Sequence, residues 1–499
     1  MNKLIDFIAH NFLVKALGII FFTIISYGLL INNLNLWSDE LYSVLMANDS
    51  LSDMWKLLTT EDSKPPLYYL YLKFVLCIFP KEFEIWGTHF ASYILLIGAQ
   101  IFALTAIRKD YGDKVSLWMI AILMLHPISL WLAFEARTYM LSSFLLLVCL
   151  VYGLRLTREP KNIDFVKFGI ACLLGLYSHY YVAICLMFLY IMILFLLIYD
   201  KTFEKFGKKF IITSICVALL FLPWIFVPLS TGEKISQYWY VTNDFVRFSV
   251  RFFTEPLQPE ILQSIFFIAT TFSASVFSFI VLCGCFNTAY FSHRLKRAFV
   301  ICILCFILSY ILLVILSYAI RPMVTARYLK IFTLLMYFGG AITIANMPSL
   351  KKAILSTLLI GFCFTYVDIK AISFDEAYTK AKNEINQYIP ENMTILALDN
   401  ANLFCEYYLP NHKCILAVGS YGEILRTPSL LKNINLYYKK IDTDIFVLSI
   451  YSEVSDNCKV YESWYRNGAN IYLCRMDKNK AQKLIDDSLN LRLNKYLNS

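Results

Sequence analysis

The sequence predicts a polytopic α-helical membrane protein that ends in a small α/β domain. Of its 499 residues, 59% are hydrophobic and only 16% are charged, and the mean hydropathy is +0.59. A soluble domain carries a larger charged share and fewer apolar residues. Long apolar runs recur along the first part of the chain, and basic residues occupy every second connection between them. This alternation is typical of a chain that crosses a membrane repeatedly.

A membrane helix needs about 20 mostly apolar residues. Eleven runs approach or reach that length: 12–31, 87–107, 115–134, 139–157, 164–178, 181–199, 210–229, 261–285, 298–320, 328–346 and 353–369. The first run is long for a signal-peptide core and no small-residue cleavage site follows it, so we expect a retained helix. We therefore assign 1–369 to a transmembrane domain with about 11 helices.

Clusters of Lys and Arg determine the expected orientation. All of the clusters become cytoplasmic if the N-terminus is inside. They are Lys3; Arg108, Lys109 and Lys114; Arg155, Arg158 and Lys161; Lys201, Lys205, Lys208 and Lys209; Arg294, Lys296 and Arg297; and Lys351 with Lys352. The protein is then an integral protein of an inner or plasma membrane with its C-terminal part outside. The clusters account for the net charge of +9, and we expect no nucleic-acid partner.

One apolar segment, 65–79, is too short to span and contains Lys73. If it crossed the membrane, every later basic cluster would invert. We expect it to form a helix at the interface, where its tyrosines suit the headgroup region. Pro65-Pro66 suits the first turn of such a helix.

The composition changes near residue 371, and we expect 370–499 to form an extracytoplasmic α/β domain. Residues 374–388 have helical periodicity, whereas 394–398, 445–450 and 470–474 read as short strands. Four cysteines lie in this part. Outside the cytoplasm they could form one or two disulfides, whose pairing the sequence leaves open. They are Cys405, Cys414, Cys458 and Cys474.

An acidic pair, Asp39-Glu40, follows the first apolar run within Trp37-Ser38-Asp39-Glu40-Leu41-Tyr42. A charge beside hydrocarbon costs several kcal/mol unless it is solvated or paired, so such a pair is a candidate functional site. A carboxylate in a like-charged pair gains basicity, which suits proton abstraction from a hydroxyl. The alternative is a pair that caps a helix end and faces water.

Two further elements in the expected outer connections carry charges. Lys64 directly precedes Pro65-Pro66, and Glu135 and Arg137 occupy the very short connection after 115–134. Lys64 and Arg137 could hold a phosphate while Glu135 faces a sugar or acceptor. Alternatively, Lys64 extends to lipid headgroups, and Glu135 and Arg137 pair with each other.

Arg321 and Arg327 also lie in an expected outer connection, against the usual charge bias. A fixed anionic ligand would explain them, and general contact with headgroup phosphates explains them about equally well. His179, in Ser178-His179-Tyr180-Tyr181, is better interpreted as an interfacial histidine than as a ligand. Several acids and bases on one membrane face suit a reaction with a lipid-phosphate leaving group, whose developing charge Lys and Arg would stabilise.

The order of these motifs resembles the GT-C glycosyltransferases of the protein O-mannosyltransferase and aminoarabinose-transferase type, in the bacterial family 39-like branch. The resemblance covers about 10–345. It rests on the acidic pair, Lys64-Pro65-Pro66-Leu67-Tyr68-Tyr69, Glu135-Ala136-Arg137-Thr138-Tyr139, the His179 turn, Leu222-Pro223-Trp224 and Arg327-Tyr328-Leu329.

The resemblance implies inverting transfer of one sugar from a polyprenyl-phosphate donor to a hydroxyl of a glycan, lipid or protein acceptor at the outer face. The catalytic residues are then Asp39 as the base, Glu40 as its neighbour in the motif, and Glu135, where relatives keep a second acidic residue. Lys64, Arg137 and Arg327 contact the donor phosphate. Candidate substrate-binding residues are Tyr42, Tyr68, Tyr139, His179, Arg321 and Tyr328.

The sequence departs from the family in two places. Ser63 separates Asp62 from Lys64, and the second outer connection lacks the Asp-x-Asp pair of metal-dependent relatives. We therefore expect no cofactor and no divalent metal. Two other classes remain open, a transporter or flippase and a polymerase of lipid-linked glycans. A transporter typically shows internal repeats and interrupted helices at the bilayer midplane, and the sequence has no such repeat.

Overall fold

The computed structural model describes residues 11–31, 34–62, 64–235, 280–320, 323–348, 377–391, 393–398, 401–417, 445–450, 458–461, 470–483 and 486. The chain forms two compact units. The first comprises Met1–Asn32, Lys64–Tyr71 and Gly87–Asp368, and the second comprises Asn33–Ser63, Leu72–Trp86 and Ile369–Ser499. Residues 32–86 form the first connection expected outside the membrane and fall within the predicted domain 1–369. Most of them nevertheless belong to the same unit as the C-terminal part.

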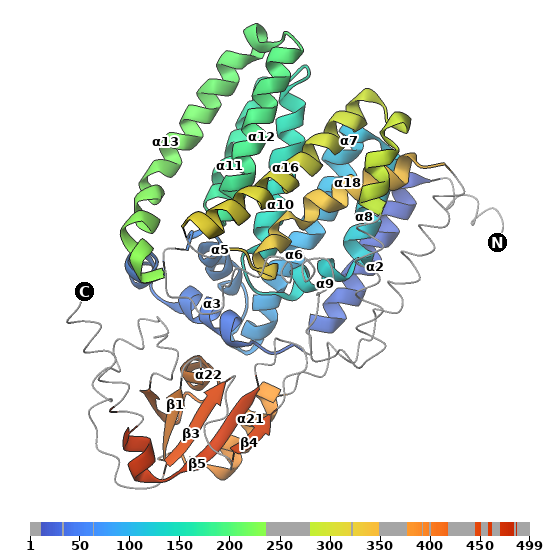
Figure 1. Ribbon diagram of the computed structural model, residues 1–499. Coiled ribbons are helices and arrows are strands. Elements are labelled where there is room, and N and C mark those ends of the chain that lie inside the picture. Colours follow the sequence, from blue (N-terminus) through green and yellow to red (C-terminus); the bar gives the residue numbers. More distant parts are fainter. Residues whose placement is uncertain are drawn as a thin grey trace, which may run out of the picture. The chain divides into compact units, whose positions relative to one another are not determined.

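The first unit is a helical bundle (Figure 1). Its elements include α2 (Phe12–Ile31), α6 (Glu84–Phe102), η3 (Ala103–Ile107), α7 (Arg108–Tyr111), α8 (Asp113–Leu125), α9 (Pro127–Phe134), α10 (Tyr139–Leu156), α11 (Asn162–Leu176), α12 (Tyr180–Tyr199), α13 (Phe203–Ile235), α16 (His293–Ala319), α17 (Ala326–Leu329), η6 (Lys330–Phe332) and α18 (Thr333–Asn346). Of the apolar stretch within Arg327–Asn346, which ends in α18, 94% is buried, against 22% of the stretch within the Phe203–Pro228 part of α13. Helix α18 is therefore central and α13 is peripheral.

Within the described residues, seven helical segments are long and apolar enough to cross a membrane, or eight if the bent pair α8 and α9 is one span. This confirms a polytopic helical membrane protein. Of the other predicted spans, α11 has only 15 residues. The run 353–369 and most of 261–285 lie outside the described residues. The segment predicted to lie at the interface contains α5 (Leu67–Leu76), a helix of only ten residues.

The run 115–134, predicted as one helix, is bent by 68° between α8 and α9. Pro127 explains the break, because proline lacks an N–H and disfavours helical geometry in the residue before it. His126 is accordingly extended, and its Nδ1 accepts a hydrogen bond from the N–H of Ile128 at 3.3 Å. A new helix therefore starts at Pro127.

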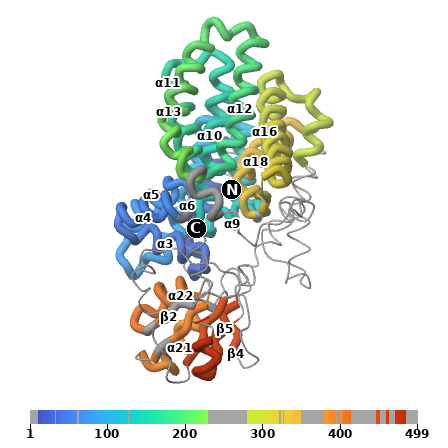
Figure 2. Tube along the Cα trace, turned by 60° about the vertical axis from the view of Figure 1, so that its left-hand side comes forward, coloured from blue at the N-terminus to red at the C-terminus, as the bar shows by residue number. Residues whose placement is uncertain are grey.

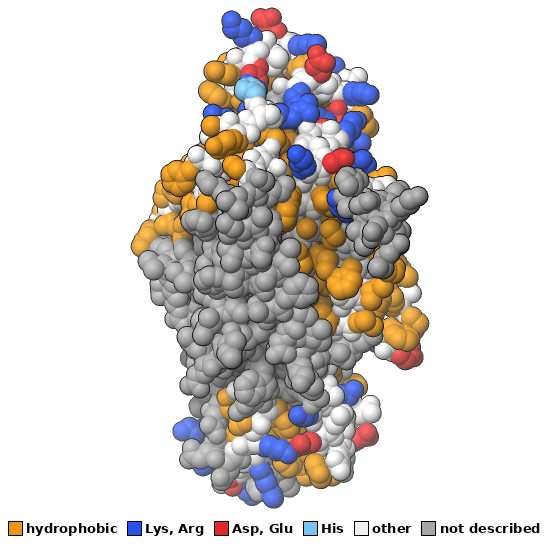
Figure 3. Space-filling model, turned by 90° about the vertical axis from the view of Figure 1, so that its right-hand side faces the viewer, with side chains coloured by type: hydrophobic (Ala, Val, Ile, Leu, Met, Phe, Trp, Pro, Cys, Tyr) orange, Lys and Arg blue, Asp and Glu red, His pale blue; other side chains and the backbone are white. Residues whose placement is uncertain are grey.

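The described surface of the bundle has a charged end and an apolar flank. Lys and Arg side chains gather at one end, and hydrophobic side chains predominate on the described part of the flank (Figure 3). Large exposed apolar residues lie on α2, α12, α13 and α16, including Phe21, Phe195, Phe226 and Ile315. A water-soluble protein would bury such a surface, so we interpret this flank as lipid-facing.

Arg155 centres an ion-pair network among the helices at the basic end. Its guanidinium contacts the Asp110 carboxylate at 2.7 Å and the Asp164 carboxylate at 3.2 Å. Asp164 also accepts the Lys161 N–H at the start of α11, and Arg294 donates to the Asp110 carbonyl at 2.7 Å. The network therefore links α7, α10, α11 and α16.

Replacing Arg155 by Met is expected to destabilise the first unit by about 3–5 kcal/mol, because it leaves two buried carboxylates without their shared cation. Thermal unfolding in detergent would measure this as a large drop in midpoint. Arg108→Met is the matched control. Its pair with Asp113 is more exposed and should contribute at most about 1 kcal/mol. Equal midpoints for the two variants would contradict the buried network.

The second unit contains α3 (Ser38–Asn48), α4 (Leu51–Leu57), the turns η1 (Leu58–Asp62) and η2 (Lys81–Phe83), α21 (Ala377–Tyr388), α22 (Ala401–Tyr408) and a five-stranded sheet. The strands lie in the order β2-β1-β3-β5-β4 (Figures 1 and 2). They are β1 (Thr394–Leu398), β2 (Lys413–Ala417), β3 (Ile445–Ile450), β4 (Cys458–Tyr461) and β5 (Ile471–Met476). The predicted α/β organisation is thus confirmed, and α22, β2 and β4 are additional elements.

A disulfide joins Cys458 to Cys474, which are opposite each other on the antiparallel strands β4 and β5. Cys405 and Cys414 are free thiols, the first buried and the second partly exposed. Of the pairings that the sequence left open, the structure contains this one.

Candidate functional site

A short, buried connection holds Glu135 and Arg137 in the first unit. Helix α9 ends at Phe134, and the Arg137 N–H donates to the Glu135 carbonyl at 2.7 Å. The Ser92 hydroxyl donates to the same carbonyl at 2.7 Å, and His89 Nδ1 bonds the Phe134 carbonyl at 2.7 Å. Only 8% of Arg137 and 4% of Glu135 are exposed. Neighbouring helices therefore fix the backbone that carries both charges.

Hydroxyl groups join this connection to the turn that carries His179. The Thr138 hydroxyl donates to the Ser178 carbonyl at 2.8 Å, and the Ser142 hydroxyl donates to Ser178 Oγ at 2.9 Å. His179 precedes α12, and its Nδ1 accepts the Tyr181 N–H at 3.1 Å. In the neutral ring the proton therefore lies on Nε2.

Lys64, Arg137 and His179 come together from three segments of the chain. Burial, together with the positive charges of Lys64 and Arg137, lowers the pKa of His179 to about 3. The Leu67 N–H donates to the Tyr177 carbonyl at 3.1 Å, which ties the Pro65-Pro66 segment to the His179 turn. The first unit therefore offers two cations beside a neutral histidine.

A cluster of aromatic rings surrounds Tyr328 and contacts His179. The His179 and Tyr328 rings have centroids 5.3 Å apart, and Tyr181 lies 5.6 Å from Tyr328. Tyr139 lies 6.2 Å from Tyr328 and stacks on Trp131 at 5.4 Å. Of the candidate substrate residues, Tyr139, His179 and Tyr328 thus share one cluster.

Sequence analysis missed Lys330 and Trp131, which also belong to this neighbourhood. Only 5% of Lys330 is exposed, and its ammonium lies 3.7 Å from the centre of the Trp131 ring. A desolvated cation over an indole face is a favourable contact. The buried Lys330 directly follows Arg327-Tyr328-Leu329, so its position in the sequence was the available signal.

Stability is expected to fall as the pH drops below about 6.5. His179 takes up a proton near its ordinary pKa when the chain is unfolded but only near 3 when folded. The contribution of neutral His179 to the free energy of unfolding is therefore complete above pH 6.5 and is lost as the pH falls toward 3. Thermal midpoints measured at several pH values would show this, and His179→Gln should flatten the dependence while the exposed His293→Gln should not. Parallel curves for the wild type and His179→Gln would contradict it.

Asp39 and Glu40 occupy the first turn of α3 in the second unit. Glu40 is fully buried, and its Oε2 accepts the N–H of Trp37 at 3.3 Å. Glu40 thereby closes the helix N-terminus as the third residue of a capping arrangement. Asp39 is only partly buried. The two carboxylates therefore differ, with one committed to the helix cap and the other left partly accessible.

The other predicted residues that the structure describes lie on α3, α5 and α17. Tyr42 is buried on α3, and Tyr68 is buried on α5 with its ring 6.0 Å from that of Tyr69. Arg327 is partly exposed in the short α17. Arg321 lies outside the described residues.

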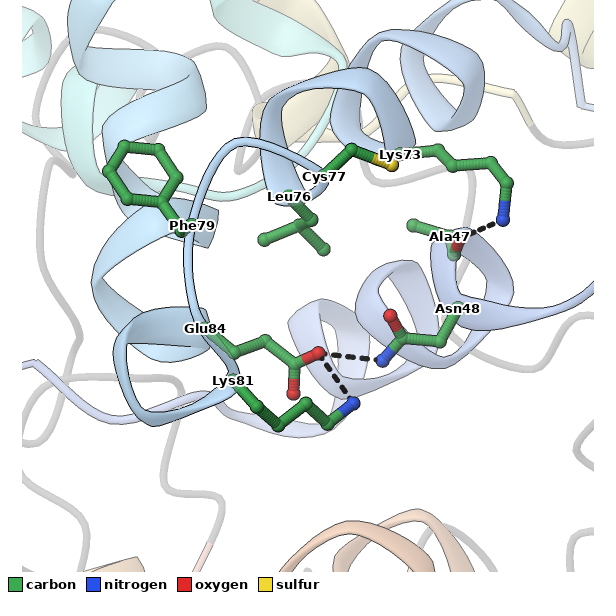
Figure 4. A pocket seen from close by; sticks show the side chains of 8 residues that line it. All are labelled: Ala47, Asn48, Lys73, Leu76, Cys77, Phe79, Lys81 and Glu84. Atoms are coloured by element: carbon green, nitrogen blue, oxygen red, sulfur yellow. Dashed lines mark hydrogen bonds and ion pairs between the residues drawn. The ribbon is translucent and has the colours of Figure 1, made fainter.

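A cavity of about 160 Å³ lies in the second unit. Figure 4 shows Asn48 and Lys81 reaching the Glu84 carboxylate, each at 2.9 Å, and Lys73 donating to the Ala47 carbonyl at 2.9 Å. The cavity borders the C-terminal end of α3, whereas Asp39 lies at the N-terminal end of that helix. The cavity is therefore separate from the acidic pair. Among the described residues, no cluster of three or more His, Cys, Asp or Glu side chains could hold a metal ion.

No protein-family model and no curated protein matches the sequence. Solved structures do. ArnT from Cupriavidus metallidurans, an aminoarabinose transferase, is similar in its apo state at 10% identity with a TM-score of 0.54, over 93% of this chain and 96% of that one. The same protein bound to undecaprenyl phosphate is similar at 11% identity with a TM-score of 0.53, over 93% and 97% of the two chains. ArnT is a GT-C glycosyltransferase, and the chain described here has the GT-C fold.

Proposed function

We propose that the protein is a membrane glycosyltransferase that moves one sugar from a polyprenyl-phosphate donor to a hydroxyl acceptor. The fold is shared over nearly the whole length with an aminoarabinose transferase, one structure of which holds undecaprenyl phosphate. Fold alone does not determine function. The proposal therefore depends on the charges of the site.

The convergence of Lys64 and Arg137 on His179 carries the proposal. Both cations act on the same histidine, and a phosphate is an anion that suits a guanidinium and an ammonium together. Neutral His179 adds no third positive charge and offers its Nε2–H as a donor. Tyr328, which is partly exposed and lies beside His179, provides a flat surface against which a sugar ring would pack.

In the proposed reaction, Asp39 accepts the proton of the acceptor hydroxyl as its oxygen attacks the anomeric carbon. The bond from that carbon to the phosphate oxygen breaks, and the lipid phosphate leaves as an anion. Lys64 and Arg137, with Arg327, stabilise the charge that develops on it. Glu40 keeps the first turn of α3 in place, and Glu135 faces the sugar or acceptor. Direct displacement inverts the anomeric configuration.

We place this reaction at the outer face of the membrane, with the C-terminal part outside. The gathering of basic side chains at one end of the bundle supports a cytoplasmic position for that end. The Cys458–Cys474 disulfide supports an oxidising compartment for the C-terminal part. We propose that no divalent metal takes part, because the cations named above supply the charge that a metal would otherwise provide.

A transfer assay tests the proposal. Purified protein is incubated with undecaprenyl phosphates that carry glucose, mannose, galactose or arabinose and with a labelled hydroxyl acceptor, with and without EDTA. We expect transfer from one of these donors, with inverted configuration and with equal rates in EDTA. Loss of activity in EDTA would overturn the metal-free mechanism. Movement of the intact donor across proteoliposomes without any transfer would favour a flippase instead.

A further inference from the structure

Two tyrosines of the C-terminal part contact the backbone that leads into α3. The Leu36 N–H donates to Tyr408 Oη at 3.0 Å, and the same hydroxyl donates to the Leu36 carbonyl at 3.3 Å. The hydroxyls of Ser38 and Tyr378 lie 3.5 Å apart. Leu36 and Tyr408 are 372 residues apart in the sequence. One phenol therefore holds both backbone groups of a residue that lies three positions before Asp39.

The two tyrosines are themselves fixed by packing. The Phe404 ring centroid lies 5.5 Å from that of Tyr378 and 5.1 Å from that of Tyr408, and all three side chains are buried. A phenol has few rotamers, and packing removes the remaining ones. The buried N–H and C=O of Leu36 also require partners. The hydroxyl of Tyr408 is thus a fixed point to which the chain is attached.

The first turn of α3 is then held from both sides of Asp39. Glu40 bonds the Trp37 N–H from within the turn, and Tyr408 bonds Leu36 just before it. Thr379 adds a third contact from α21, because its hydroxyl donates to Asn35 Oδ1 at 2.9 Å. Tyr408 and Thr379, both from the C-terminal part, thus contact the segment that leads into the first turn of α3.

We propose that Tyr408, supported by Tyr378, is a positioning residue that keeps the Asp39 carboxylate in place for proton transfer. This inference rests on the proposed function of Asp39 as the base. A displacement of about 1 Å at a reacting group can lower a rate about 100-fold. A small shift of this turn would therefore slow the chemical step while donor binding stays the same.

The test compares Tyr408→Phe with Tyr407→Phe in the full-length protein. Both variants remove one hydroxyl from α22, but that of Tyr407 interacts with Glu84 rather than with the segment before Asp39. The donor is the undecaprenyl-phosphate sugar that supports transfer in the assay above. We expect Tyr408→Phe to lower kcat about tenfold or more with an unchanged KM for the donor. Tyr407→Phe should keep the wild-type kcat.

Hydrogen exchange gives a readout that does not require activity. Amides in 34–41 should exchange about tenfold faster in Tyr408→Phe than in Tyr407→Phe, because one buried N–H loses its partner. If Tyr408→Phe misfolds, Tyr378→Phe serves as the second variant and should show the same pattern with a smaller effect.

The possible outcomes distinguish the positioning role of Tyr408 from the catalytic role of Asp39. A wild-type kcat for Tyr408→Phe, alongside an inactive Asp39→Asn, would overturn the positioning role and leave the proposed function intact. A fall in kcat matched by an equal fall for Tyr407→Phe would also overturn it. Full activity of Asp39→Asn would instead overturn the catalytic assignment itself.

Discussion

Replacing Asp39 by Asn is expected to reduce sugar transfer about 10²–10⁴-fold, the usual contribution of a general base. The amide keeps the size of the side chain but cannot accept the proton of the acceptor hydroxyl. Donor binding should remain, because the proposed phosphate ligands lie on other segments of the chain. The measurements are kcat in the transfer assay and the affinity for undecaprenyl phosphate.

Glu40→Gln is the matched control for this prediction. It removes the same charge from the adjacent residue, yet a glutamine can still accept the Trp37 N–H that Glu40 Oε2 accepts. We expect Glu40→Gln to keep most of the activity, whereas Glu40→Ala should cost about 0.5–2 kcal/mol of stability through loss of the cap. If Glu40→Gln loses as much activity as Asp39→Asn, the two acids act together and Asp39 is not the sole base.

The membrane fold followed from the sequence because hydrocarbon imposes a single, strong requirement on length and polarity. Helices α2, α10, α12 and α16 begin and end close to the predicted runs. The prediction was wrong at 115–134, where hydropathy alone gave one helix. Pro127 causes the break between α8 and α9, and a hydropathy average does not include the effect of proline on backbone geometry.

The C-terminal part was less predictable. Strands β1 and β3 have the predicted bounds, because each is a short apolar run with its own turn signals. Strand β4 was missed because Cys458-Lys459-Val460-Tyr461 lacks an apolar run, and its pairing with β5 depends on a partner elsewhere in the chain. The placement of 33–63 with this part was missed for a similar reason. Contacts between residues more than 370 positions apart leave no local pattern.

The candidate site was predictable in its charges but not in its grouping. For the acidic pair, a helix cap was the alternative interpretation, and the contact of Glu40 with the Trp37 N–H fits that alternative for Glu40. Lys64 and Arg137 were expected to contact one phosphate, but no sequence pattern indicated that both act on His179. Lys330 was overlooked because a single lysine beside an apolar run is normally a basic flank at the membrane surface.

The second large effect is expected from Arg137 and Lys64. Arg137→Gln should lower kcat/KM for the donor about 10²–10³-fold, the range seen when one electrostatic contact to a developing anion is removed. Lys64→Gln should have a similar effect. Arg137→Lys should recover little of the lost kcat/KM, because an ammonium cannot make the two parallel hydrogen bonds of a planar guanidinium.

A double-mutant cycle tests whether the two cations share one anion. If both contact the same phosphate, the loss in Arg137→Gln with Lys64→Gln should be smaller than the product of the single losses. Arg158→Gln is the control, since this arginine bonds the Tyr111 hydroxyl at 3.2 Å in another part of the first unit and should leave donor kinetics unchanged. Strictly multiplicative losses with an unchanged affinity for undecaprenyl phosphate would mean that Arg137 and Lys64 act on different groups. The phosphate would then have to be held by other cations, of which Arg327 and the buried Lys330 are the next to test.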